Sequence, residues 1–133
     1  MKVEDNRHKH SPTKIALVTG GFDPIHSGHI QYLKAAATYA DYLIVGVNSD
    51  EWLTRKKGRP FMPLEERVAI LNELLVVDEV ITFDDSDDTG CGAIEKVKEL
   101  YKDPFGGEFH KKLIFCNGGD RTADNVPEQE RFK

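Results

Sequence analysis

Short unbroken apolar runs alternate along this chain with segments in which apolar residues recur at helical spacing. The runs Ile15–Val18 and Tyr42–Val47 have the length of strands, and turn-forming residues follow each of them. Unbroken apolarity is typical of strands buried on both faces, as in a parallel sheet. We therefore predict strands over 15–20 and 42–47. Between them we predict a helix over about 28–40, from the periodic apolar positions Ile30, Leu33, Ala36, Ala37 and Ala40.

The same alternation continues through the second half of the chain. The remaining elements are predicted, in order, as a helix over 50–54, a helix opened by Pro63, a strand over 76–83, a helix over 89–101 and a strand over 113–116. The helix after Pro63 has an apolar stripe at Val68, Leu71, Leu74 and Leu75. This rhythm predicts an α/β fold with a Rossmann-like, doubly wound parallel sheet and right-handed crossovers, in one domain over 14–133.

Composition narrows the classes of function. The chain has 133 residues and a net charge of −5, which disfavours a nucleic-acid-binding surface but allows a small anionic ligand. Cys91 and Cys116 form neither a metal-ligand pair nor a disulfide framework, so a reducing, cytoplasmic setting is expected. No apolar run has the length of a membrane span, so no membrane partner is expected. Residues 1–13 read as a disordered polar tail, and its His8 and His10 are not expected to bind metal.

The segment Gly20–His29 concentrates the candidate chemistry, because there the first predicted strand turns into the first predicted helix. The N-terminus of a helix offers unpaired N–H groups and about half a positive charge, so it attracts phosphate. Gly20 and Gly21 allow a ligand close to the backbone, and His26 and His29 can donate hydrogen bonds to phosphate oxygens. The alternative is an ordinary glycine turn with two solvated histidines. The strand before it and the amphipathic helix after it favour a phosphate-binding cradle.

Two runs of charge lie between predicted elements. The basic cluster Arg55–Arg59, with Gly58 and two prolines nearby, predicts a mobile loop that could close over phosphates or be merely solvated. The acidic run Asp84–Asp88 lacks the glycine and terminal glutamate of a calcium loop. We expect it, or Thr89, to cap the helix predicted over 89–101.

Several ordered motifs together resemble a known family. Gly-Gly-Phe-Asp-Pro-Ile-His-Ser-Gly-His at 20–29 is similar to the first signature of the cytidylyltransferase-like nucleotidyltransferases, with its His-x-Gly-His core. The resemblance is strongest to the ADP-heptose synthase nucleotidyltransferase domains and the glycerol-3-phosphate cytidylyltransferases. It covers about residues 14–128 through the further segments Val47–Asp50, Lys57–Pro60, Leu64–Arg67 and Asn117–Asp120.

The resemblance implies roles for individual residues. It implies a catalytic group of His26, His29, Lys57 and Arg67. It implies nucleotide binding by Gly20, Gly21, Phe22, Asp23, Gly28, Gly118, Gly119 and Asp120, and acceptor binding by Arg59 and Arg121. Lys56 is a weaker candidate than Lys57, Asp23 is expected to orient the turn, and a surface ion pair is the alternative for Arg67. Mg²⁺ bridging the nucleotide phosphates is the expected cofactor, with no metal site assigned to protein residues.

The implied activity is nucleotidyl transfer. CMP or AMP would pass from CTP or ATP to a small phosphorylated acceptor, glycerol phosphate or a sugar phosphate, with release of pyrophosphate. Two alternatives are a non-catalytic nucleotide-binding or regulatory module and an assembly subunit with a vestigial pocket. A fragment of a class I aminoacyl-tRNA synthetase would share the His-x-Gly-His motif, but the negative net charge of this chain disfavours a tRNA-binding surface.

The C-terminal part departs from the family pattern. Relatives continue into a fifth strand and a last helix that holds the triphosphate, and on this resemblance both are expected to be missing. The chain would then be a fragment of a longer protein or have an incomplete site. The strand predicted over 113–116 would form an exposed sheet edge, so we expect a homodimer contact to cover it.

Overall fold

The computed structural model describes residues 14–103, 105, 107–109 and 111–116. In chain order its elements are β1 (Lys14–Gly20), α1 (Ser27–Ala37), β2 (Tyr42–Val47), α2 (Asp50–Lys57), α3 (Leu64–Asn72), β3 (Glu79–Thr82), α4 (Cys91–Leu100) and β4 (Lys112–Cys116). The predicted tail, 1–13, and the predicted glycine turn after β4, 117–121, lie outside the described residues.

The four strands form one parallel sheet in the order β3-β2-β1-β4. The chain builds outward from β1 through β2 to β3 and then returns to the other side of β1. Val18 of β1 therefore pairs with Val45 of β2 and with Cys116 of β4. This confirms the predicted α/β class and doubly wound sheet, with β4 beside β1 where the strand order reverses. In such sheets ligands bind at the carboxyl ends of the strands beside this reversal.

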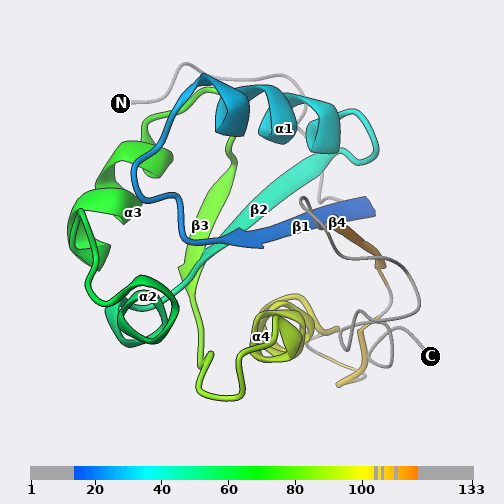
Figure 1. Cartoon of the computed structure of the whole chain (residues 1–133). Helices are drawn as coiled ribbons and strands as arrows, with labels where there is room; N and C mark the ends of the chain where they lie inside the picture. Colours follow the sequence, from blue (N-terminus) through cyan, green and yellow to red (C-terminus); the bar gives the residue numbers. More distant parts are fainter. Residues whose placement is uncertain (1–13, 104, 106, 110, 117–133) are drawn as a thin grey trace.

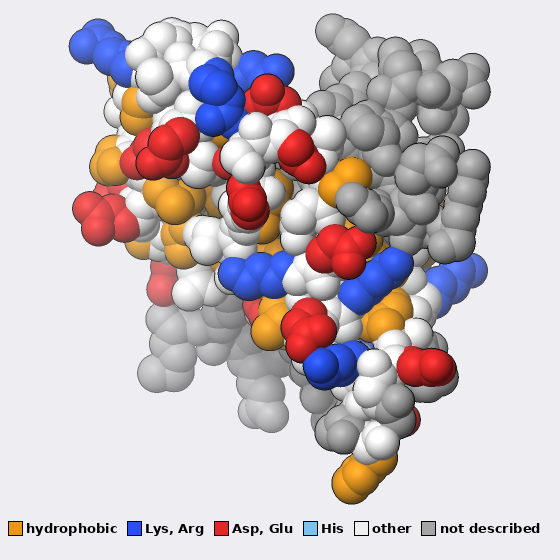
Figure 2. Space-filling model, turned by 90° about the horizontal axis from the view of Figure 1, so that it is seen from below, with side chains coloured by type: hydrophobic (Ala, Val, Ile, Leu, Met, Phe, Trp, Pro, Cys, Tyr) orange, Lys and Arg blue, Asp and Glu red, His pale blue; other side chains and the backbone are white. Residues whose placement is uncertain are grey.

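Helices cover both faces of the sheet (Figure 1). On one face α1 and α3 pack on Ala16 and Val18 of β1. On the other face α4 packs on Ile15 and Leu17. Alternate side chains of one strand thus enter two different cores, which explains the unbroken apolarity of the β1 sequence. Seen from the α4 side, acidic and basic side chains are interspersed over the described surface (Figure 2).

Two predicted boundaries are wrong, and local geometry gives the reasons. Helix α2 does not end at Thr54 but continues to Lys57, where Gly58 caps it with φ of 92° and donates to the carbonyl of Thr54. Arg55–Lys57, predicted as a loop, therefore form the last turn of a helix. β3 is shorter than predicted, because the Val77 N–H closes a turn onto the Leu74 carbonyl before the strand begins.

The acidic run after β3 serves a different helix from the one predicted. Asp85 is buried, and it accepts hydrogen bonds from the Asn48 amide and from both the N–H and the hydroxyl of Ser49, at 2.7 to 3.0 Å. Its carboxylate therefore secures the start of α2. The N-cap of α4 is Gly90, without a side-chain cap bond. Neither the acidic run nor Thr89 is the predicted cap, although the Thr89 hydroxyl, one residue before the N-cap, accepts from the Cys91 N–H at 3.1 Å.

Candidate nucleotide-binding site

The turn from β1 into α1 is held in an unusual backbone shape. Phe22 has φ of 53°, a value that few residues with a side chain adopt, and the Asp23–Pro24 peptide is cis. The Phe22 ring is buried, lies under Gly20 and meets the His29 ring edge-on at 5.2 Å between centroids. A Cβ on Gly20 would lie 3.1 Å from that ring, so Phe22 and Gly20 fit each other closely. Phe22 thereby packs against the His29 ring.

The two histidines cap the helix that they flank. His26 is the N-cap of α1, and its Nδ1 accepts a hydrogen bond from the Gly28 N–H at 3.1 Å. In return the His29 Nδ1 accepts from the His26 N–H at 3.1 Å, which completes a reciprocal capping box. A neutral imidazole that accepts at Nδ1 carries its proton on Nε2. Both rings therefore keep an Nε2–H donor for a ligand.

Ring packing and burial keep these imidazoles in place. Their centroids are 3.9 Å apart at an interplanar angle of 31°, so the rings pack against each other. Partial burial, with a smaller effect of the neighbouring His26 charge, lowers the pKa of His29 below its usual value. The lowered pKa favours the neutral imidazole, whose Nδ1 can accept the hydrogen bond of the cap.

A pocket of about 480 Å³ opens beside this capped helix start. Its lining consists of Thr19, Gly20, Gly21, Phe22, His26, Gly28, His29 and Tyr32. Gly28 is required by the cap itself, because a Cβ there would lie 2.9 Å from Cε1 of His26. Thr19 and Tyr32 were not among the predicted site residues. Tyr32 follows His29 by one helical turn, and that spacing would have identified it.

A second group of contacts ties the turn to the segment before α3. The Asp23 side chain is only 1% exposed and contacts Lys57 Nζ at 2.7 Å. Its carboxylate also accepts from the N–H groups of Phe61 and Met62, each at 2.6 Å. Burial raises the pKa of Asp23, but the hydrogen bonds from Lys57 and the two N–H groups outweigh it, and the pKa is lowered. The Asp23 carboxylate thus joins the turn to Lys57 and to the segment before α3, and its role in nucleotide binding stays a prediction.

Arg67 is enclosed by the protein. Its residue is 0% exposed, and its guanidinium donates to the carbonyls of Met62, Gly21 and Asn48. It also pairs with the Asp50 carboxylate at 2.7 Å. This arrangement departs from the expected reach to nucleotide phosphates and from the alternative of a surface ion pair. Arg67 joins the ends of β1 and β2 to α2 and α3 from inside.

The three cations at the end of α2 differ in their partners. Arg55 pairs with Asp88 at 2.9 Å, and Lys57 pairs with Asp23. Lys56 has no carboxylate partner among the described residues, and its Nζ lies 5.4 Å from the centre of the Trp52 ring. Arg59 is exposed in the segment after Gly58. The ranking of Lys57 above Lys56 therefore does not follow from the structure, in which Lys56 is the more available cation.

Comparison with known proteins identifies the family. Residues 17–130 match the family model described as cytidylyltransferase-like, which covers most of the chain. This chain belongs to the cytidylyltransferase-like family. The sequence resemblance is thereby confirmed.

Two curated relatives of this cytidylyltransferase-like chain are both named bifunctional protein HldE. The protein from Sulfurimonas denitrificans is 40% identical over 112 residues, which cover 81% of this chain and 22% of that protein. The protein from Alcanivorax borkumensis is 36% identical over 133 residues, which cover 98% of this chain and 24% of that protein. The chain thus spans about a quarter of the length of these relatives. A solved structure, the lipopolysaccharide core biosynthesis protein from Thermoplasma volcanium, matches with a TM-score of 0.61 and 25% identity, covering 83% of this chain and 100% of that one.

The structure brings together only some of the predicted site residues of this cytidylyltransferase-like chain. The glycines and histidines of the first signature line one pocket, whereas Asp23, Lys57 and Arg67 are absent from its lining and form ion pairs within the protein. Gly118, Gly119, Asp120 and Arg121 lie outside the described residues, so their roles stay predictions. Within the described part of the chain, no helix is both long and apolar enough to cross a bilayer.

Proposed function

We propose that this chain is a nucleotidyltransferase that moves CMP or AMP from CTP or ATP to a small phosphorylated acceptor and releases pyrophosphate. The observation that carries the proposal is the pair of imidazoles, His26 and His29, that cap the start of α1. Each has an Nε2–H left for a ligand, and both line a pocket of about 480 Å³. Membership of the cytidylyltransferase-like family supports the same reaction class.

The proposed reaction is an in-line displacement at the α-phosphorus of the nucleotide. An oxygen of the acceptor phosphate forms the new bond to this phosphorus, and the bond to the pyrophosphate oxygen breaks. A phosphate monoester is already mostly ionised at neutral pH, with a second pKa of about 6, so no strong base is needed. The protein positions the groups and stabilises growing negative charge. His26 and His29 do so by donating from Nε2 to phosphate oxygens, and the N-terminus of α1 adds its partial positive charge.

Mg²⁺ fits this site as a cation carried by the nucleotide. No group of three or more His, Cys, Asp or Glu side chains that could hold a metal occurs among the described residues. Mg²⁺ commonly keeps several waters and is held largely by substrate phosphates. When bound to the phosphates it neutralises charge on the pyrophosphate, while His26 and His29 supply the donors from the protein.

A sugar phosphate is the acceptor that the comparisons favour. The Thermoplasma volcanium neighbour is named a lipopolysaccharide core biosynthesis protein, and lipopolysaccharide cores are built from sugars. Glycerol phosphate is the second candidate acceptor. The choice between CTP and ATP is left to experiment.

The test measures pyrophosphate release with each nucleoside triphosphate and Mg²⁺ against a set of phosphorylated sugars and alcohols. We expect turnover with one nucleotide and one class of acceptor. No release with any pair, for a chain that binds nucleotide in calorimetry, would replace this proposal with the second candidate, a non-catalytic nucleotide-binding module. That candidate is favoured by one observation, that Lys57 and Arg67 are both paired with carboxylates of the protein.

A further inference from the structure

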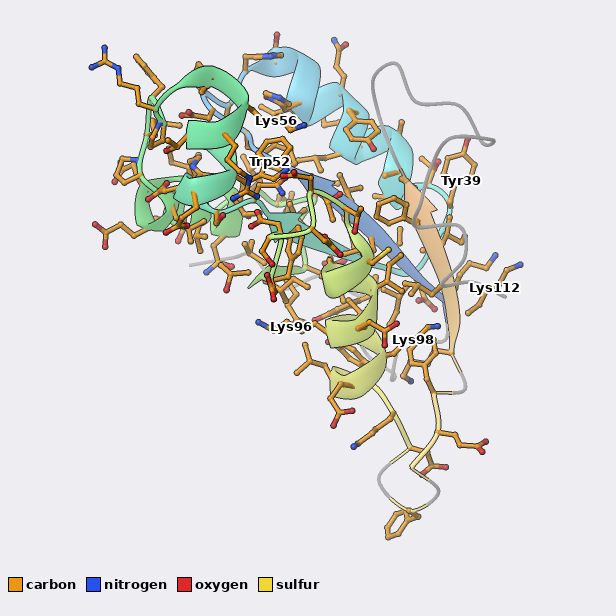
Figure 3. The ribbon with its side chains drawn as sticks, turned by 60° about the horizontal axis from the view of Figure 1, so that its bottom comes forward. Tyr39, Trp52, Lys56, Lys96, Lys98 and Lys112 are labelled. Atoms are coloured by element: carbon orange, nitrogen blue, oxygen red, sulfur yellow. The ribbon has the colours of Figure 1, made fainter. Side chains whose placement is uncertain are left out.

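Helix α2 carries an aromatic ring and a cation next to the pocket. Figure 3 shows Trp52 and Lys56 close together on the side of α2 that faces α1. The edge of the indole lies 3.5 Å from the position that a Cβ on Gly21 would take, and Gly21 lines the pocket. The Lys56 ammonium lies 5.4 Å from the ring centre. Trp52 and Lys56 therefore stand at the Gly21 side of the nucleotide pocket.

The position of the indole is set by the core of the fold. The backbone N–H of Trp52 donates to the Ser49 hydroxyl at 3.0 Å, and this hydroxyl donates to the Asp85 carboxylate at 2.7 Å. The next residue, Leu53, is buried and packs on Gly21. Trp52 itself is only partly buried. A rigid backbone thus presents a ring that still has surface left for a ligand.

Among the described residues, the cation beside the ring has no carboxylate partner. Arg55 and Lys57 pair with Asp88 and Asp23, whereas the contact that the described part of the structure gives to Lys56 is the weak attraction of an exposed ammonium for an indole face. A phosphate group would be a better partner for this ammonium than the indole is. The pair therefore offers an apolar flat surface with a phosphate-binding charge at its edge.

We propose that Trp52 and Lys56 form the acceptor subsite, in which the indole takes the apolar face of a sugar ring and Lys56 takes the phosphate of the same molecule. This inference rests on the proposed function and narrows its acceptor to a phosphorylated sugar. The lining of the pocket includes Gly21 and, on α1, His29 and Tyr32, but not Trp52 or Lys56, so a nucleotide in the pocket would leave these two side chains of α2 to the second reactant. In-line attack also requires the acceptor to approach from the side opposite the leaving pyrophosphate. A three-carbon glycerol phosphate would leave most of the indole uncovered.

The first test uses fluorescence, because Trp52 is the only tryptophan of the chain. The emission of the full chain is recorded during titration with hexose and heptose phosphates, glycerol 3-phosphate, inorganic phosphate, CTP and ATP. We expect the sugar phosphates to change the emission at concentrations about tenfold lower than glycerol 3-phosphate or inorganic phosphate. A response to nucleotide alone would assign the ring to the nucleobase, and no response to any sugar phosphate would overturn the subsite.

The second test separates the two substrates by kinetics. Trp52→Ala and Lys56→Gln should each raise the acceptor KM about tenfold or more, and leave the nucleotide KM within about twofold. Trp52→Phe should restore much of the acceptor affinity. Arg55→Gln removes the neighbouring cation that Asp88 holds, and it is the matched control with unchanged KM values. Equal changes in the acceptor KM and the nucleotide KM, or an unchanged acceptor KM in the Trp52 and Lys56 variants, would refute the assignment.

The two proposals can fail separately. If the unmodified chain releases no pyrophosphate with any pair of substrates, the proposed function fails, and the fluorescence titration still decides whether Trp52 meets a sugar phosphate. If the unmodified chain releases pyrophosphate but the Trp52 and Lys56 variants have an unchanged acceptor KM, the proposed subsite is wrong and the proposed function stands. A melting temperature for each variant shows that the fold is retained.

Discussion

The start of α1 and the start of α3 both gather polar side chains around one turn, and they use them in opposite ways. At the start of α1 each imidazole satisfies a backbone N–H with Nδ1 and keeps its Nε2–H for a ligand. At the start of α3 the guanidinium of Arg67 donates its hydrogen bonds to carbonyl and carboxylate groups of the protein, and the ammonium of Lys57 pairs with the Asp23 carboxylate. The comparison shows that a side chain can bind a ligand only through those hydrogen-bond donors that have no partner within the protein.

The largest expected effect is on folding. Arg67→Met should lower the free energy of unfolding by about 3 kcal/mol or more, because it leaves the buried Asn48 carbonyl, the partly buried Met62 and Gly21 carbonyls and the Asp50 carboxylate without their donor. Arg55→Met, which breaks a half-exposed pair with Asp88, should cost under about 1 kcal/mol. Urea unfolding of both variants measures the difference. Equal losses would mean that the network around Arg67 is no stronger than a surface pair.

The next effect is on turnover. His29→Ala removes one Nε2 donor and should slow pyrophosphate release about 100-fold or more. The melting temperature should change by only a few degrees, since the loss is one cap bond at a helix start. Gln31→Ala, an exposed change on the same helix, is the control. Turnover close to that of the unmodified chain would remove His29 from the catalytic role.

Gly28→Ala should give a smaller loss of turnover, about tenfold, with little loss of stability. The new Cβ would lie 2.9 Å from the His26 ring, so the ring has to turn away and give up its cap bond. Alanine inside a helix offsets the lost bond by about 1 kcal/mol. Kinetics and thermal melting measure the two quantities, with Ser27→Ala as the neighbouring control. A variant with unchanged kcat would show that the close fit of His26 on Gly28 is dispensable.

A further effect concerns acid stability. The lowered pKa of Asp23 means that its contribution to stability is complete above its unfolded pKa of about 3.9 and is lost as the pH falls through the folded value. Asp23→Asn should therefore be less stable than the unmodified chain at pH 7, and the gap should narrow below about pH 4. Urea unfolding at several pH values measures this gap. A gap independent of pH would mean that the Asp23 charge contributes nothing.

The smallest expected effect is a shift in the pKa of His29. Burial lowers the pKa of His29, so its imidazole should stay neutral down to a pH below the usual value of about 6.5. NMR titration of the imidazole protons, with His29→Ala to assign them, measures the midpoint directly. A midpoint above the usual value would mean that His29 is charged when it meets phosphate, and that its Nδ1 does not cap the helix.

Much of the fold and part of the site could be predicted from the sequence. The unbroken apolar runs predicted the parallel strands, and the alternation of strands and helices predicted the doubly wound sheet. The signature Gly20–His29 predicted a glycine turn and a helix start with two imidazoles, and all of these line one pocket. The position of Gly58 could also have marked the end of α2, because glycine commonly terminates helices.

What the sequence by itself determined is local: which segments are strands or helices, and which turn can cradle an anion. These properties depend on spacing, backbone freedom and residue type within a few positions of one another. The tertiary structure alone decided how the charges are used. Arg67, Lys57 and Asp23 were predicted as site residues from the sequence. Apart from the Met62 carbonyl, which is five residues from Arg67, the groups that they contact lie 17 to 46 residues away along the chain. The availability of a charged side chain is a property of its neighbours in space, which no local pattern contains.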